Sequence, residues 1–124
     1  MFSLLFSPTA KTLATRLVGV AGDNTQGRVE VNYNGQGWGT ICQNAWSLNN
    51  SDVVCKMLGF NSADSFTTGS SYGSGLGRIW FDNVRCNGRE SNLLDCFSYN
   101  GPLVSSCDHS MDVGVTCSCK SLHM

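Results

Sequence analysis

The chain has 124 residues and a formal net charge of −1 at pH 7, with 41% hydrophobic and 14% charged residues. This length is enough for one compact domain with a hydrophobic core, but not comfortably for two. The near-neutral charge excludes the overall positive field that draws proteins to nucleic acid or anionic membranes, and no stretch approaches the roughly 20 apolar residues that insert across a bilayer.

Seven cysteines fall between Cys42 and Cys119. Reducing compartments rarely keep such sets oxidised, which predicts an extracellular setting, either in a secreted protein or in the ectodomain of a membrane protein. Residues 1–15 form a poorly defined lead-in. Residues 1–7 are apolar but lack the positive start of a signal peptide, so a signal remnant and the boundary of a longer chain both stay open.

Two strands joined by a tight turn are expected early in the chain, after a first short strand. Residues 16–20 predict that first strand and residues 21–24 a turn. Residues 27–33 alternate apolar and polar side chains with the period of a half-buried strand. The dipeptide Asn34-Gly35 is a strong hairpin signal, so residues 38–42 are expected to return as the partner strand.

The apolar period changes to that of a helix over residues 51–58. Asn50 or Ser51 can cap the start of this helix, and Gly59 can close its C-terminus. Residues 61–77 are rich in Ser, Thr and Gly, which predicts a long loop.

Three further elements complete the chain. Residues 79–86 and 113–117 are predicted strands, and residues 91–96 a single helical turn. Together the elements predict an α+β fold, in which a small curved antiparallel β-sheet cradles one main α-helix and disulfides hold the two together.

Several short motifs occur in the order typical of one known family. They are Arg16-Leu-Val-Gly, Gly27-Arg-Val-Glu-Val, Trp38-Gly-Thr-Ile-Cys, Asp52-Val-Val-Cys-Lys-Met-Leu-Gly, Ile79-Trp-Phe-Asp-Asn-Val-Arg-Cys, Gly88-Arg-Glu-Ser and Asp112-Val-Gly-Val-Thr-Cys. Each motif is weak alone, but with six cysteines in register the chain resembles the scavenger receptor cysteine-rich (SRCR) family, in its six-cysteine subgroup (group A). The resemblance implies an SRCR-like domain over residues 16–118 and a C-terminal tail over residues 119–124.

The resemblance also implies how the cysteines pair, which spacing alone could not decide. The expected disulfides are Cys42–Cys107, Cys55–Cys117 and Cys86–Cys96. A larger subgroup carries two more cysteines, at the positions of Gln26 and Phe60 here. Cys119 is left over as a free thiol or a partner for a cysteine elsewhere; a zinc site with Cys117 and His123 would lack an evident fourth ligand.

Calcium binding is a trait of many relatives, whose carboxylates the resemblance places at three positions. Those positions hold Gln43, Asn44 and Met111 here, and only the neighbouring Asp112 is acidic. Calcium prefers several charged oxygen ligands, so we expect no metal and no cofactor, with Asp112 serving as a hydrogen-bonding structural residue. Calcium held by amide oxygens is the disfavoured alternative.

Anion binding is the second trait that the resemblance implies. The guanidinium group suits sulfate, phosphate and carboxylate because it donates in pairs. The sequence leaves open whether its basic residues share one face, and scattered surface charges contribute little. The candidate ligand-binding residues are Arg28, Arg78, Arg85 and Arg89, with Lys56.

A glycosylation sequon and three tryptophans lead to expectations about the surface and the core. Asn49-Asn50-Ser51 is an acceptor sequon, so Asn49 is a candidate glycosylation site in a secreted chain. Trp38, Trp46 and Trp80 are expected to fill the core rather than to stack on a ligand.

Catalysis is not expected. His109 is the one plausible general base, and neither a Gly-x-Ser-x-Gly turn nor a glycine-rich phosphate loop occurs. The expected function is an extracellular ligand-binding module of scavenger-receptor type, within a larger receptor or secreted protein, that recognises a protein or a polyanion. The alternatives are a structural spacer domain without its own ligand and, last, an enzyme.

Overall fold

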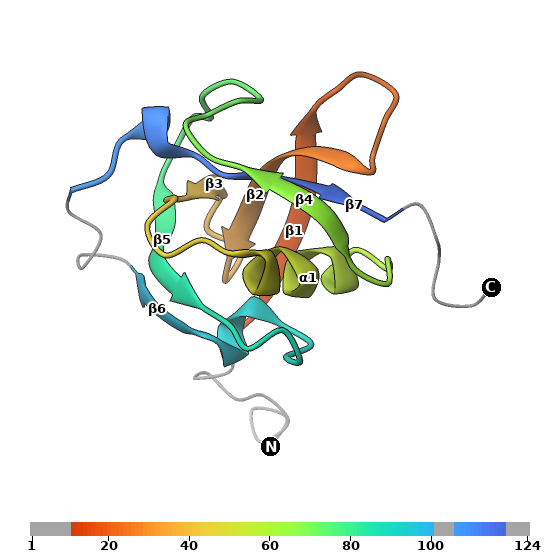
Figure 1. The fold of residues 1–124 in the computed structure, drawn as a ribbon. Coiled ribbons are helices and arrows are strands. Elements are labelled where there is room, and N and C mark those ends of the chain that lie inside the picture. Colours follow the sequence, from red (N-terminus) through yellow and green to blue (C-terminus); the bar gives the residue numbers. More distant parts are fainter. Residues whose placement is uncertain (1–10, 101–105, 119–124) are drawn as a thin grey trace, which may run out of the picture.

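The computed structural model describes residues 11–100 and 106–118, as one sheet with one main helix (Figure 1). The strands are β1 (Leu13–Gly19), β2 (Gln26–Tyr33), β3 (Trp38–Ile41), β4 (Ala63–Thr67), β5 (Ile79–Arg85), β6 (Phe97–Asn100) and β7 (Gly114–Cys117). The helical segments are α1 (Leu48–Met57) and the single 3₁₀ turns η2 (Leu93–Asp95) and η4 (His109–Met111).

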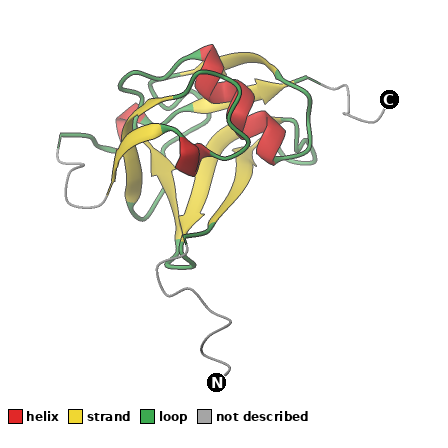
Figure 2. Ribbon diagram, turned by 90° about the horizontal axis from the view of Figure 1, so that it is seen from below, coloured by secondary structure: helices red, strands yellow, loops and turns green. Residues whose placement is uncertain are grey.

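The strands form a seven-stranded sheet in the order β4-β7-β2-β3-β5-β6, and β1 pairs with β2 outside this path. All neighbouring strands are antiparallel except β3 and β5, which run parallel. The main helix α1 packs against β4, β5 and β7 and crosses over the curved strands (Figure 2). The expected curved sheet around one helix is therefore confirmed, with one parallel pair in it.

The predicted turn between the second and third strands is present. Asn34 and Gly35 have φ angles of 55° and 71°, which lie in the left-handed region that a type I′ turn requires at both positions. The N–H of Gln36 donates to the carbonyl of Tyr33 across the turn, at 3.1 Å.

The main helix begins earlier than its apolar period indicates. Its N-cap is Ser47, whose hydroxyl accepts from the backbone N–H of Asn50, so the expected cap at Asn50 or Ser51 is wrong. The Asn50 side chain is fully buried instead. It donates to the carbonyl of Val84 at 2.7 Å and accepts from the N–H of Cys86 at 2.9 Å, which joins the helix to the end of β5.

The helix ends where the sequence predicts. Gly59 has a φ of 93°, and its N–H donates to the carbonyl of Lys56 at 3.0 Å. The N–H of Phe60 donates to the carbonyl of Cys55 at 2.9 Å, which completes a Schellman arrangement around the glycine.

Three strand predictions need correction. β1 begins at Leu13 rather than Arg16, and β4 occupies part of the expected loop over residues 61–77. β6 follows the predicted helical turn and was not expected as a strand. β4 and β6 lie at the two ends of the strand order, where one neighbour is missing and the alternation of buried and exposed side chains is weaker.

The core lies between the sheet and α1 and is built mainly from small branched side chains. Trp46 and Trp80 are 7% and 4% exposed and belong to it, as expected. Trp38 does not, because it is only half-buried and lies outside the core cluster. The fully or nearly fully buried aliphatic residues are Val29, Val31, Ile41, Val53, Val54, Val84, Val113 and Val115.

Three disulfides connect the elements. Cys55 of α1 is bonded to Cys117 of β7. Cys42, directly after β3, is bonded to Cys107, two residues before η4. The third bond closes a short loop between Cys86 and Cys96. These are the pairs that the family resemblance implies. No helix among the described residues is long and apolar enough to cross a bilayer.

Candidate functional site

A buried carboxylate on β2 organises one face of the sheet. Glu30 is 6% exposed and lies opposite Arg16 of β1 in the strand register. Its Oε1 accepts from Nε and Nη2 of Arg16, at 2.9 and 2.7 Å. Its Oε2 accepts from Nε and Nη2 of Arg28, at 3.0 and 2.9 Å. One carboxylate thus holds two guanidinium groups in fixed orientations, by two charge-assisted bonds each.

Arg28 is a structural residue. Its side chain is 13% exposed, and its Nη1 donates to the carbonyls of Tyr72 and Gly73, at 3.2 and 3.1 Å. The guanidinium therefore connects β2 to the loop between β4 and β5. Because most of its donors are used within the protein, Arg28 offers little to a ligand.

Arg16 is the exposed member of the pair. Its side chain is 47% exposed, and its guanidinium carbon lies 4.1 Å from the ring centroid of Trp38. The two side chains border a pocket of about 400 Å³ that opens to solvent. The pocket is lined by Arg16, Val18, Arg28, Glu30, Trp38, Leu76 and Gly77.

One wall of the pocket is the glycine-rich loop between β4 and β5. Leu76 is 85% exposed, yet both of its neighbours are held in place. The N–H of Gly75 donates to Oδ2 of the buried Asp112 at 2.7 Å, and the carbonyl of Gly77 lies 2.8 Å from Nε2 of His109. The loop thus presents an apolar side chain to solvent from a fixed backbone.

His109 lies between two acceptors. Its Nδ1 is 3.0 Å from Oδ2 of Asp112, and only the imidazolium form can donate from both ring nitrogens. Burial acts to lower the pKa of His109. The hydrogen bond to Gly77 and the hydrogen bond and charge of Asp112 outweigh burial and the positive charge of Arg28, so the pKa lies above its ordinary value.

The four arginines expected to bind a ligand do not form one patch. Arg78 is exposed and stacks on the core residue Trp80, at 4.6 Å. Arg85 is at the other end of β5, roughly 20 Å away at the usual rise of a strand. Arg89 follows on the loop after it. Of the four, only Arg28 lines the pocket, and its donors are used internally.

The exposed guanidinium of the pocket, Arg16, was missed from the sequence. The signal that could have identified Arg16 is its position opposite Glu30. That position is known only once the register between β1 and β2 is known. The Nζ of Lys56 donates to the carbonyl of Gly88 at 2.6 Å, so that lysine also holds a loop. Asn49 is exposed in the first turn of α1, while the Ser51 hydroxyl of its sequon is buried.

Gln43, Asn44 and Asp112, which stand where the family resemblance implies calcium ligands, make hydrogen bonds within the protein. Oε1 of Gln43 accepts from the N–H of Gly69 at 2.7 Å. Nδ2 of Asn44 donates to Oδ1 of Asp82 at 3.1 Å. Asp112 is 1% exposed and accepts from the loop and from His109, as described above. These residues do not fit a calcium ion, because the one remaining carboxylate is turned inward.

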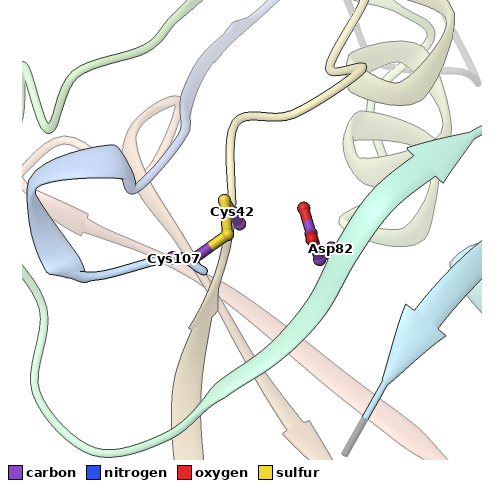
Figure 3. Close-up of side chains that lie close together, drawn as sticks. All are labelled: Cys42, Asp82 and Cys107. Atoms are coloured by element: carbon purple, nitrogen blue, oxygen red, sulfur yellow. A yellow bond between two sulfur atoms is a disulfide. The ribbon is translucent and has the colours of Figure 1, made fainter. Parts of the chain in front are cut away.

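The side-chain clusters of the described residues that resemble metal ligand sets contain disulfide sulfurs. Figure 3 shows the Asp82 carboxylate of β5 beside the Cys42–Cys107 disulfide. The second cluster places Glu90 beside the Cys86–Cys96 disulfide. A disulfide provides no thiolate, so neither cluster has the donors of a zinc site.

Calcium is expected not to bind this chain at micromolar concentrations, as titration calorimetry would show. The variant that combines Gln43→Asp, Asn44→Asp and Met111→Glu restores the missing carboxylates. It is expected to bind calcium with a dissociation constant of about 10⁻⁴–10⁻³ M, the range of extracellular modules. A micromolar constant for the natural chain would contradict this expectation.

Comparisons with known proteins identify the family. The family model of the scavenger receptor cysteine-rich domain matches residues 20–118, so the chain belongs to the SRCR domain family. The chain is 40% identical to the third SRCR domain of murine neurotrypsin, with a TM-score of 0.76 over 86% of this chain and 96% of that one. The chain is 42% identical to the SRCR domain of mouse MARCO, with a TM-score of 0.68 over 82% of this chain and 94% of that one.

A longer relative shows the context in which such a domain occurs. The chain is 49% identical over 107 residues to lysyl oxidase homolog 2B of Danio rerio, a match that covers 86% of this chain. It spans only 14% of the length of that protein.

Proposed function

We propose that this SRCR domain is an extracellular recognition module for a protein ligand, forming one part of a larger protein. The observation that carries the proposal is the open pocket beside Arg16 and Trp38, whose polar and apolar groups are held in place before any ligand binds. Such preorganisation lowers the entropy that association costs. The three disulfides support an extracellular setting and the six-cysteine subgroup, group A.

A polyanion is the less favoured ligand. Strong binding of a sulfated chain needs several unpaired cations along one surface, whereas Arg78, Arg85 and Arg89 are spread along and beyond β5. A spacer without a ligand is the other alternative, and it is favoured by the absence of acidic side chains at Gln43, Asn44 and Met111.

The test is binding of the oxidised chain to cultured cells and the matrix they lay down, with calcium and then with a chelator. We expect saturable binding that survives the chelator and that protease treatment of the surface removes. Loss of binding after enzymatic removal of sulfated sugar chains would indicate a polyanion ligand instead. Binding in none of these conditions would support the spacer.

A further inference from the structure

The exposed arginine of the pocket keeps donors available for an anionic group. Nε and one hydrogen of Nη2 of Arg16 are directed to Glu30, while Nη1 has no acceptor within the described part of the chain. Glu30 and Trp38 fix the plane of the guanidinium. Its Nη2 lies 2.7 Å from Oε1 of Glu30, and its central carbon lies 4.1 Å from the ring centroid of Trp38. An incoming carboxylate would therefore meet a donor pair whose side-chain entropy is already largely lost.

The charge of the pocket suits one anionic group rather than many. Arg16 and Arg28 carry two positive charges and Glu30 carries one negative charge, which leaves one positive charge over the three side chains. Arg28 has its Nη1 bound to two carbonyls. A row of sulfates would find a single available guanidinium here, so the balance favours a lone carboxylate.

The opposite wall adds apolar recognition. Among the residues that the structure describes, Leu76 is the most exposed large hydrophobic residue, at 85%. Its exposure is built into the backbone, because a Cβ at Gly75 would lie 2.5 Å from the Thr40 methyl and one at Gly77 would lie 2.8 Å from the Trp38 carbonyl. The loop therefore packs closely on β3 on both sides of Leu76 and leaves that side chain facing outward.

We propose that this pocket binds an acidic side chain of a protein partner together with an apolar residue next to it in the partner's chain. The partner's carboxylate contacts Nη1 of Arg16, and its apolar side chain packs between Leu76 and Trp38. The pocket volume of about 400 Å³ is that of a small-ligand site and accommodates a short segment rather than a folded element. This inference rests on the proposed recognition function and names the chemistry of its ligand.

The test uses the full 124-residue chain with its disulfides formed, and two peptide probes that differ in one charge. The probes are N-acetyl-Leu-Glu-Leu-amide and the same peptide with glutamine in place of glutamate. Nitrogen-15 NMR titration is expected to show shifts at the Trp38 indole, at Leu76 and at Gly77. We expect a dissociation constant on the order of 1 mM for the glutamate peptide and about tenfold weaker binding of the glutamine peptide, because a charge-assisted hydrogen bond is lost.

Matched variants separate the pocket from general charge effects. Arg16→Gln and Leu76→Ser are each expected to weaken binding of the glutamate peptide, by about tenfold and a few fold respectively. Arg78→Gln is the control, since Arg78 also stacks on a tryptophan but lies outside the pocket, and it should leave binding unchanged. Leu76 is exposed, so its replacement keeps the test valid even if loss of Arg16 disturbs the fold.

The inference would be overturned by equal binding of the two peptides, by no effect of Leu76→Ser, or by an effect of Arg78→Gln as large as that of Arg16→Gln. Dextran sulfate that binds through Arg16 while neither peptide binds would also overturn it, in favour of a polyanion. Binding to the cell matrix that persists in Arg16→Gln and Leu76→Ser would refute this site and leave the recognition function standing.

Discussion

Replacement of Cys55 and Cys117 together by alanine is expected to lower the free energy of unfolding by about 4 kcal/mol, the chain-entropy value for a loop of this length. The bond closes a loop of 62 residues and joins α1 to β7 in the core, where both cysteines are at most 1% exposed. Domains of this size are stable by roughly 5–15 kcal/mol. Because loss of a native disulfide from a small secreted domain often prevents folding at 37 °C, we expect the variant to be partly unfolded at that temperature and full reduction of the chain to unfold it.

The short disulfide is the matched control for this loss. Cys86 and Cys96 close a loop of only 10 residues and are half-buried. Alanine at both positions should cost about 3 kcal/mol by the same model, clearly less than the long-loop pair. Urea unfolding followed by near-ultraviolet circular dichroism measures both variants. A near-ultraviolet spectrum that stays unchanged under strong reductant would contradict the expectation.

The parts of the fold that could be predicted are those with a clear local signal. Residues 27–33 alternate because β2 is central, with neighbours on both sides and one face on the core. Asn34 and Gly35 specify their turn by themselves, through positive φ angles. The short strands β4 and β6 lie at the ends of the strand order, so their pairing depends on partners that are distant in sequence.

The site was harder to predict because its contacts are long-range. Arg28 was expected to face a ligand, but its guanidinium meets the carbonyls of Tyr72 and Gly73, which lie 44 and 45 residues further along the chain. Arg16 has its partner 14 residues away, across a strand pair whose register no local pattern fixes. Asp112 was expected to be structural, and its buried carboxylate does hold the N–H of Gly75.

Raising the pH through neutrality is expected to destabilise the domain through His109. The pKa of His109 lies above its ordinary value, so the stability that its charge contributes is fully present below the unfolded value of about 6.5. That stability is lost as the pH rises through the higher folded pKa. The urea concentration at the unfolding midpoint should therefore decrease as the pH is raised from 6 to 8. The slope of the unfolding free energy against pH should correspond to no more than one proton.

The carboxyl groups with shifted pKa values do not change the stability between pH 6 and 8. The pKa values of Asp23, Glu90 and Asp108 are lowered, chiefly by hydrogen bonds from their near neighbours. Their contributions are present above their unfolded pKa values of about 4 and are lost only as the pH falls further. Asp112 favours the charge of His109 and Arg28 opposes it. The exposed carboxylate of Asp108 also interacts with that charge.

His109→Gln is expected to abolish the fall in stability between pH 6 and 8, because glutamine carries no titrating proton. His123→Gln is the control for the second histidine, which lies outside the described residues. A pH dependence that survives His109→Gln and disappears in His123→Gln would show that the assignment is wrong.

The same deprotonation has a local consequence at the pocket. A neutral imidazole that keeps its proton on Nδ1, facing Asp112, turns a bare Nε2 toward the carbonyl of Gly77. That contact holds one side of Leu76, so the exposed wall of the pocket should loosen before the sheet does. Amide hydrogen exchange at Gly75, whose N–H donates to Asp112, is therefore expected to rise with pH more steeply than base catalysis alone explains, and His109→Gln should remove the excess. Exchange that follows base catalysis in both proteins would mean that the loop is held without the charge on His109.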